Sequence, residues 1–116
     1  MNRIVLAVLA AAIASAAAAQ TTSTPVTLTL VAVDAVKVRS SSDLTLSGVL
    51  DDGSTVTQKA INFGTNTALR DKCERFALLA MTKPGQYRLV VGGYESPSTY
   101  GTYVTWNDCS VVRAAP

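Results

Sequence analysis

One stretch of the sequence decides the fold, residues 66–85, which read NTALRDKCERFALLAMTKPG. Apolar side chains recur there at spacings of three and four, a period that predicts one amphipathic helix of about 15 residues. Asn66 or Thr67 can cap its start, and Lys83-Pro84-Gly85 ends it, because proline cannot continue the hydrogen-bond ladder and glycine takes the turn. We expect the buried stripe to consist of Leu69, Cys73, Phe76, Ala77 and Ala80.

On both sides of this helix the sequence alternates between apolar and polar residues, which indicates β-strands. We predict strands over residues 26–38, 44–50 and 55–63 before the helix, and over residues 86–91 and 103–112 after it. Between the last two strands, residues 92–101 are rich in glycine and serine and are expected to form a long loop.

Irregularities are expected at three places in these strands. The first strand is so long that we expect it to bend or bulge near Asp34-Ala35. Gly48 is expected to kink the second strand, and a change of face between Val56 and Ile61 predicts a bulge in the third. An Asp-Gly step in residues 51–54 predicts a tight hairpin turn, which makes the second and third strands antiparallel.

The element order β-β-β-α-β-β over residues 26–113 resembles the OB-fold, a five-stranded and partly open barrel. Within it the run KCERFALLAMTKPGQY, residues 72–87, is similar to the helix and following strand of small exported OB-like proteins of bacteria. We therefore predict a single, mainly β domain over residues 26–116. The alternative is a small immunoglobulin-like sandwich, which needs about seven strands and leaves the helix as an intrusion.

The first residues predict export. Asn2 and Arg3 form a short positive region, residues 4–15 are apolar, and Ala17-Ala18-Ala19 fits the small-residue rule for cleavage before Gln20. We interpret residues 1–19 as a signal peptide and residues 20–25 as a flexible lead-in. The expected location is secreted or periplasmic, with no membrane span after signal cleavage.

The two cysteines, Cys73 and Cys109, are expected to form a structural disulfide, since an even count in an exported chain indicates disulfide bonding. Cys73 lies on the apolar stripe of the helix, so the bond should tie the helix to the last strand. A redox pair would more often be Cys-x-x-Cys, and two thiols without histidine are too few ligands for a metal site.

Composition limits the function further. The chain of 116 residues has no histidine, which removes the commonest general base and the commonest metal ligand. Loss of residues 1–19 leaves nine basic and eight acidic residues, a balance that disfavours nucleic acid as a partner. No nucleophile, phosphate-binding or dinucleotide-binding motif is present, so we predict a protein that is not an enzyme and has no cofactor or metal.

In an OB-like barrel, ligands bind at the second and third strands and between the loops that join strands one to two and four to five. Those loops are residues 39–42 and 92–106, and they hold Arg39 and four of the seven aromatic residues of the chain. The aromatic rings can stack on a sugar face, while Arg39, Lys37 or Lys59 orients polar groups. The predicted ligand-binding residues are Arg39, Tyr94, Tyr100, Tyr103 and Trp106.

Three functions are compatible with this pattern. The leading one is an exported binding module that recognises an unknown protein or glycan through those loops. The second is a structural module of the cell envelope that pairs through an exposed strand edge. The third, a hydrolase that uses carboxylates, requires acids such as Asp71, Glu74, Asp51 and Asp52 to converge. These acids also have simpler explanations, the turn at 51–54 and i,i+4 ion pairs from Arg70 to Glu74 and from Asp71 to Arg75.

Overall fold

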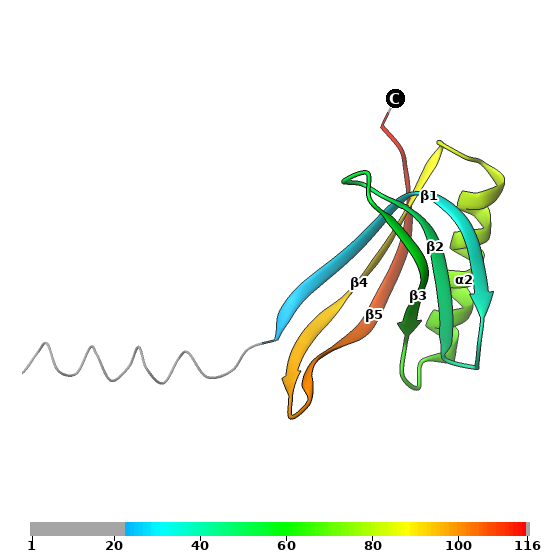
Figure 1. The fold of residues 1–116 in the computed structure, drawn as a ribbon. Helices are drawn as coiled ribbons and strands as arrows, with labels where there is room; N and C mark the ends of the chain where they lie inside the picture. The colour runs from blue at the N-terminus through cyan, green and yellow to red at the C-terminus, as the bar shows by residue number, and fades with distance from the viewer. Residues whose placement is uncertain (1–22, 116) are drawn as a thin grey trace, which may run out of the picture.

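The computed structural model describes residues 23–115, so the predicted signal peptide and the first residues of the lead-in lie outside the described part. Five strands and one helix follow in the predicted order: β1 (Thr24–Val38), β2 (Asp43–Leu50), β3 (Thr55–Asn62), α2 (Thr67–Thr82), β4 (Tyr87–Ser98) and β5 (Gly101–Arg113). The strands form one antiparallel sheet in the order β3-β2-β1-β4-β5, which coils around the core with α2 against one side (Figure 1).

The predicted fold class is confirmed. The structure is mainly β with a single helix between the third and fourth strands of the described chain. In the described residues the edge strands β3 and β5 approach each other without forming a ladder, so the sheet stays open. Element order and strand order are compatible with a partly open OB-like barrel, and a two-sheet sandwich is not formed.

β1 joins the two halves of the sheet. Its first part pairs with β4 from Thr24 to Leu30, and its second part pairs with β2 from Leu30 to Val38. The register with β2 shifts twice, between Leu30 and Ala32 and again between Val33 and Ala35, which confirms the predicted bulge. Each shift adds a residue, so the inward positions Leu30, Val33 and Val36 are three apart instead of two.

β1 begins at Thr24, two residues before the predicted start of the strand. Thr24 pairs with Glu95 and Pro25 pairs with Tyr94. Pro25 is tolerated because the first residues of a strand are positions where a missing backbone donor does little harm.

β2 and β3 form the predicted hairpin. Gly53 adopts a positive φ of 89°, and the carboxylate of Asp52 accepts hydrogen bonds from the backbone and hydroxyl of Ser54 at 2.9 and 2.6 Å. The predicted bulge in β3 is confirmed at Gln58, where the register shifts and φ is 49°. The hydroxyl of Ser47 accepts a hydrogen bond from the Gln58 amide at 2.8 Å and so satisfies the bulged residue.

The helix agrees with its prediction at both ends. The Oδ1 atom of Asn66 accepts a hydrogen bond from the Leu69 amide at 3.0 Å, and the helix stops at Thr82 before Pro84. Cys73, Ala77 and Ala80 are buried, whereas Phe76 is only partly buried against the same core. Its ring therefore packs at the rim, and the fully enclosed aromatic ring near the helix is that of Phe63.

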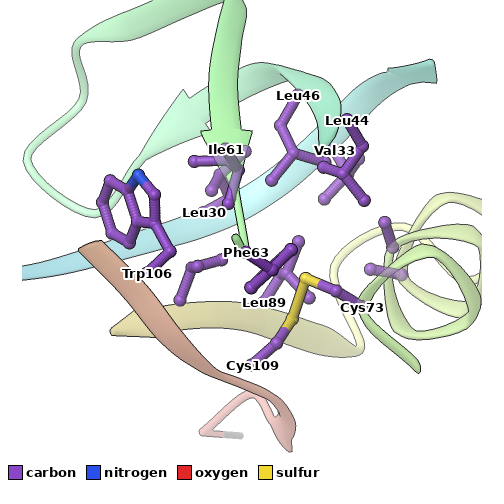
Figure 2. Packing of buried hydrophobic residues seen from close by; sticks show 13 residues of the cluster. Leu30, Val33, Leu44, Leu46, Ile61, Phe63, Cys73, Leu89, Trp106 and Cys109 are labelled. Carbon is purple, nitrogen blue, oxygen red and sulfur yellow. A yellow bond between two sulfur atoms is a disulfide. The ribbon is translucent and has the colours of Figure 1, made fainter. Parts of the chain in front are cut away.

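The predicted disulfide between Cys73 and Cys109 is present, with the two Cα atoms 5.5 Å apart. Figure 2 shows it between α2 and β5, beside Leu89 and Phe63. Both cysteines are buried within one continuous core that draws on every strand and on the helix. Such a bond fits an oxidising compartment outside the cytoplasm.

The region after β4 departs from its prediction. The expected loop over residues 92–101 does not exist, because β4 continues to Ser98 and β5 starts at Gly101. The two strands are joined by a tight turn at Thr99 and Tyr100, with Gly101 at a φ of 118°. The glycines that suggested a loop have another role: a Cβ on Gly93 would overlap the backbone carbonyl of Thr105, so glycine allows the two strands to approach.

Candidate binding surface

The hairpin between Gly93 and Trp106, called here the tyrosine hairpin, carries three of the four tyrosines of the chain. It extends beyond the start of β1 and projects from the body of the sheet (Figure 1). The exposed fractions of its tyrosines are 46% for Tyr94, 98% for Tyr100 and 54% for Tyr103. Aromatic rings so open to solvent add nothing to the core, which makes this hairpin the candidate binding surface.

Register places two of these rings on the same face. Tyr94 is paired with Thr105, and Tyr103 is paired with Ser96, so the two tyrosines are diagonal neighbours across the strands. Pro25 of β1 pairs with Tyr94 from the other side and shares that face. The result is a row of apolar rings, Pro25, Tyr94 and Tyr103, flanked by serine and threonine side chains. The sequence pattern did not predict Pro25 as part of this surface, because it placed residues 20–25 in a flexible lead-in.

Trp106 lies on the opposite face of the hairpin. It is paired with Gly93, and only 6% of its surface is exposed. The ring lies in the core beside Leu30 in Figure 2, so it packs against other core side chains. Simple alternation predicts opposite faces for Trp106 and Cys109. A register shift at Asn107 adds one residue and turns both side chains inward.

Arg39 is not brought together with the tyrosines. It follows the C-terminal end of β1, whereas Tyr94 pairs with the N-terminal end of the same strand. Pro25 and Val38 are thirteen positions apart in one strand, a path of roughly 40 Å. Arg39 is exposed, and its amide donates to the carbonyl of Asp43 in the loop over residues 39–42. The two predicted ligand loops thus lie at opposite ends of β1.

The lysines named with Arg39 also lie away from the hairpin. Lys37 pairs with Thr45 and Lys59 pairs with Leu46, both in the half of the sheet built from β1, β2 and β3. Both side chains are exposed. The structure therefore separates the predicted site into an aromatic part and a cationic part that do not meet.

Charge is distributed unevenly over the sheet. Residues 23–29 and 96–107, which lie toward the hairpin end, contain no charged side chain. Glu95 is the one charged residue of the tyrosine hairpin, and its partners Thr24 and Val104 put it on the face away from Tyr94 and Tyr103. Within the hairpin the tyrosine face is thus uncharged, and Asp108, which pairs with Gly92 next to the hairpin, places a carboxylate on the same face.

The four carboxylates of the hydrolase hypothesis lie on two separate elements. Asp51 and Asp52 are exposed in the β2–β3 turn, where the hydrogen bonds from Ser54 lower the pKa of Asp52 below its ordinary value of 3.8. On α2, Arg70 contacts Asp71 at 2.6 Å and Glu74 at 3.5 Å. The predicted pair of Arg70 with Glu74 is confirmed, and Asp71 pairs with Arg70 instead of Arg75.

Arg70 also ties the helix to the first loop. Its Nε donates to the carbonyl of Ser41 at 3.2 Å, and its side chain is largely buried. The carboxylates on α2 therefore hold a structural cation in place. Asp71 and Glu74 thus share one ion-pair partner on their own helix.

An open hollow of about 370 Å³ lies at the far end of β4 and β5, lined by residues 85–87 and 113–115. Residues 23–115 contain no group of three or more histidine, cysteine or acidic side chains placed to hold a metal ion. Among the same residues, no helix has the length and apolar character needed to cross a bilayer.

Comparison with protein-family models, with curated proteins and with solved structures finds no match for this chain.

Proposed function

We propose that the protein is an exported, non-catalytic binding module that recognises its partner through the tyrosine hairpin. One observation carries this proposal: the chain exposes Tyr94, Tyr100 and Tyr103 on a projecting two-stranded element while it buries Trp106 beneath them. Tyrosine is suited to recognition because its ring contributes apolar area, its hydroxyl forms hydrogen bonds, and it loses little conformational entropy. The resemblance of the sequence to small exported OB-like proteins of bacteria supports this proposal.

The disulfide supports the exported location, together with the pattern of residues 1–19. A non-catalytic role is supported by the structural explanations of Asp52, Asp71 and Glu74. The partner classes considered from the sequence, a protein or a glycan, both fit a surface of tyrosine and hydroxyl side chains.

Calorimetric titration against a panel of soluble glycans and peptides tests the proposal. Trp106 is buried, so its fluorescence is a poor reporter, and heat is the better signal. A panel member that binds should lose its affinity for the Tyr94→Ser/Tyr103→Ser variant and keep it for Val112→Ser, a control at an exposed apolar position of β5 outside the hairpin. Equal binding to both variants would show that another surface is used.

The second candidate is an envelope module that pairs through its edge strand. β5 runs for 13 residues and pairs with β4 along one edge, while the described residues place no ladder on its other edge. An open edge of this length can accept a strand from another chain. The variant Thr102→Lys, at an exposed position of β5, should abolish such pairing, and an unchanged assembly state in size-exclusion chromatography would exclude this use of the edge.

A further inference from the structure

The two edges of the sheet differ in how well they resist pairing with another strand. The edge strand β3 carries the exposed Lys59 and a bulge at Gln58, where φ is 49°, and both features hinder the addition of a strand. In β5, residues 101–105 read GTYVT and have no charge, no proline and no bulge, because the register shift of this strand lies at Asn107. Threonine, tyrosine and valine also favour extended chain. These five residues, called here the open segment, are therefore the unprotected part of the edge.

The open segment is accessible in the domain. Its residues are exposed except for Val104, which is partly buried. Within residues 23–115, β5 has a ladder with β4 alone and ends the sheet. Figure 1 shows the tip of the tyrosine hairpin standing apart from β3 and α2. A further strand can thus approach the open segment without displacing another element.

Pro97 determines which backbone groups point out of this edge. It pairs with Thr102 and has no amide proton, so this pair is of the kind without hydrogen bonds between its members. The register has no shift from Gly93 to Ser98, so alternation gives Val104 the same kind of pair. In such pairs the N–H and C=O groups point away from the partner strand. The backbone groups of Thr102 and Val104 therefore point away from β4, out of the open edge.

From these observations we propose that two copies of the chain pair antiparallel through their open segments, with Thr102 of each copy opposite Val104 of the other. Each of these two pairs exchanges two hydrogen bonds, which satisfies every outward backbone group of the open segment. One sheet then continues through both copies. This inference rests on the second candidate function, the module that pairs through its edge strand, because it names the partner of the same edge.

The side chains favour a second copy as the occupant. The register places Tyr103 on the two-fold axis, opposite Tyr103 of the other copy, with the two Cβ atoms about 4.5–5.5 Å apart. The ring is 54% exposed in the single chain and gains an aromatic neighbour in the pair. On the other face, the β-branched side chains of Thr102 and Val104 lie opposite each other. The open segment is thus complementary to itself.

The charges near the edge also permit two copies to meet. Asp108 lies five positions from Tyr103, so the two copies of Asp108 are ten positions apart, roughly 30 Å along the paired strands. Glu95 lies on β4, and three inter-strand spacings, roughly 14 Å, separate it from its copy. Both distances exceed the Debye length of about 8–10 Å in physiological salt. Self-pairing therefore brings no like charges into contact.

Sedimentation equilibrium of the exported protein, residues 20–116 with the disulfide formed, measures the self-association. The wild-type protein should form dimers as its concentration rises to about 1 mM, the range of a weak interface. Thr102→Lys should weaken dimerisation by on the order of tenfold or more, because it puts a charge into the paired segment of each copy. Leu78→Lys adds the same charge on α2, where Leu78 is 45% exposed, and should leave dimerisation unchanged. A wild-type protein that stays monomeric, or equal weakening by both variants, would overturn the inference.

Oxidative cross-linking tests the register and separates this inference from the function on which it rests. Tyr103→Cys places a thiol on the two-fold axis and should give a disulfide-linked dimer, whereas Val112→Cys, at an exposed position of β5 outside the open segment, should stay mainly monomeric. If Thr102→Lys disrupts assembly but Tyr103→Cys links no better than Val112→Cys, β5 pairs with a different strand. That result would overturn the inference and retain the edge-pairing module. An assembly that Thr102→Lys leaves intact would overturn both.

Discussion

The disulfide should supply a large part of the stability of this domain, which replacing both cysteines by alanine would show. Cys73 and Cys109 are 36 positions apart and join α2 to β5. Both side chains are buried, so alanine is preferred to serine, whose hydroxyl would lack a partner there. The double replacement also avoids a free thiol that could form bonds between molecules.

The expected loss follows from the length of the loop that the bond closes. On the chain-entropy model, a closed loop of this length raises the free energy of unfolding by about 4 kcal/mol. Domains of this size have a total stability of about 5–15 kcal/mol, so the loss removes a substantial fraction. The two small cavities left by the sulfur atoms add to the effect with the same sign.

Urea denaturation followed by far-UV circular dichroism measures the difference, and the wild-type protein under reducing conditions is the control. The Cys73→Ala/Cys109→Ala variant and the reduced wild type should unfold at similar, lower urea concentrations. A loss below about 1 kcal/mol in both would refute the role given to the cross-link, since the loop-closure contribution is several times larger.

Three further predictions concern single positions. Gly93→Ala should lower the free energy of unfolding by about 1–3 kcal/mol in urea denaturation, because its Cβ would overlap the backbone of β5. The control Gly92→Ala, whose Cβ would have its nearest contact at 3.7 Å, should change the free energy of unfolding by less than about 0.5 kcal/mol. Equal losses in the two variants would contradict the close approach of the strands. Asn66→Ala should lower the free energy of unfolding by about 1 kcal/mol, because it removes the helix cap, whereas Asn66→Asp should keep most of the stability of the wild-type protein. Identical thermal melts for all three proteins would argue against the cap. The pKa of Asp52 should lie below 3.8 by NMR titration and rise in Ser54→Ala, and an unchanged pKa in the variant would exclude Ser54 as the cause. Because folding lowers this pKa, the carboxylate stabilises the fold at pH values above the pKa of the unfolded chain, and this stabilisation is lost as the pH falls through the pKa of the folded protein.

The sequence predicted the helix and the element order because each depends on local signals. Asn66 at the helix start, Pro84 after its end and the Asp-Gly step in residues 51–54 each act within a few residues. The pairing of Cys73 with Cys109 was also accessible, since two cysteines allow only one intramolecular bond.

The candidate site was predicted less well, for two physical reasons. Gly92 and Gly93 look like turn residues in sequence, but Gly93 is needed where two strands come too close for a side chain. The second reason is the shift at Asn107. Alternation places Trp106 and Cys109 on opposite faces of β5, but the added residue lets both side chains enter the core. Such a shift depends on contacts between strands, which periodicity along one strand does not contain.

The separation of Arg39 from the tyrosines has a related cause. Whether two loops of a barrel lie close together depends on how far each strand extends past its neighbours. β1 is long enough to hold its two ends apart, even though each end lies next to a predicted loop. Fold analogy therefore grouped residues that the strand keeps distant.

The shared strand also determines how the molecule can come apart. β1 is hydrogen-bonded to β4 along one part and to β2 along the other, and Leu30 belongs to both ladders. The β2–β3 hairpin and the β4–β5 hairpin cover different parts of β1, so detachment of either one exposes the part of β1 that the other does not cover. Thermal fluctuations should therefore open the domain as one cooperative unit, with the amide protons around Leu30 among the last to exchange with solvent.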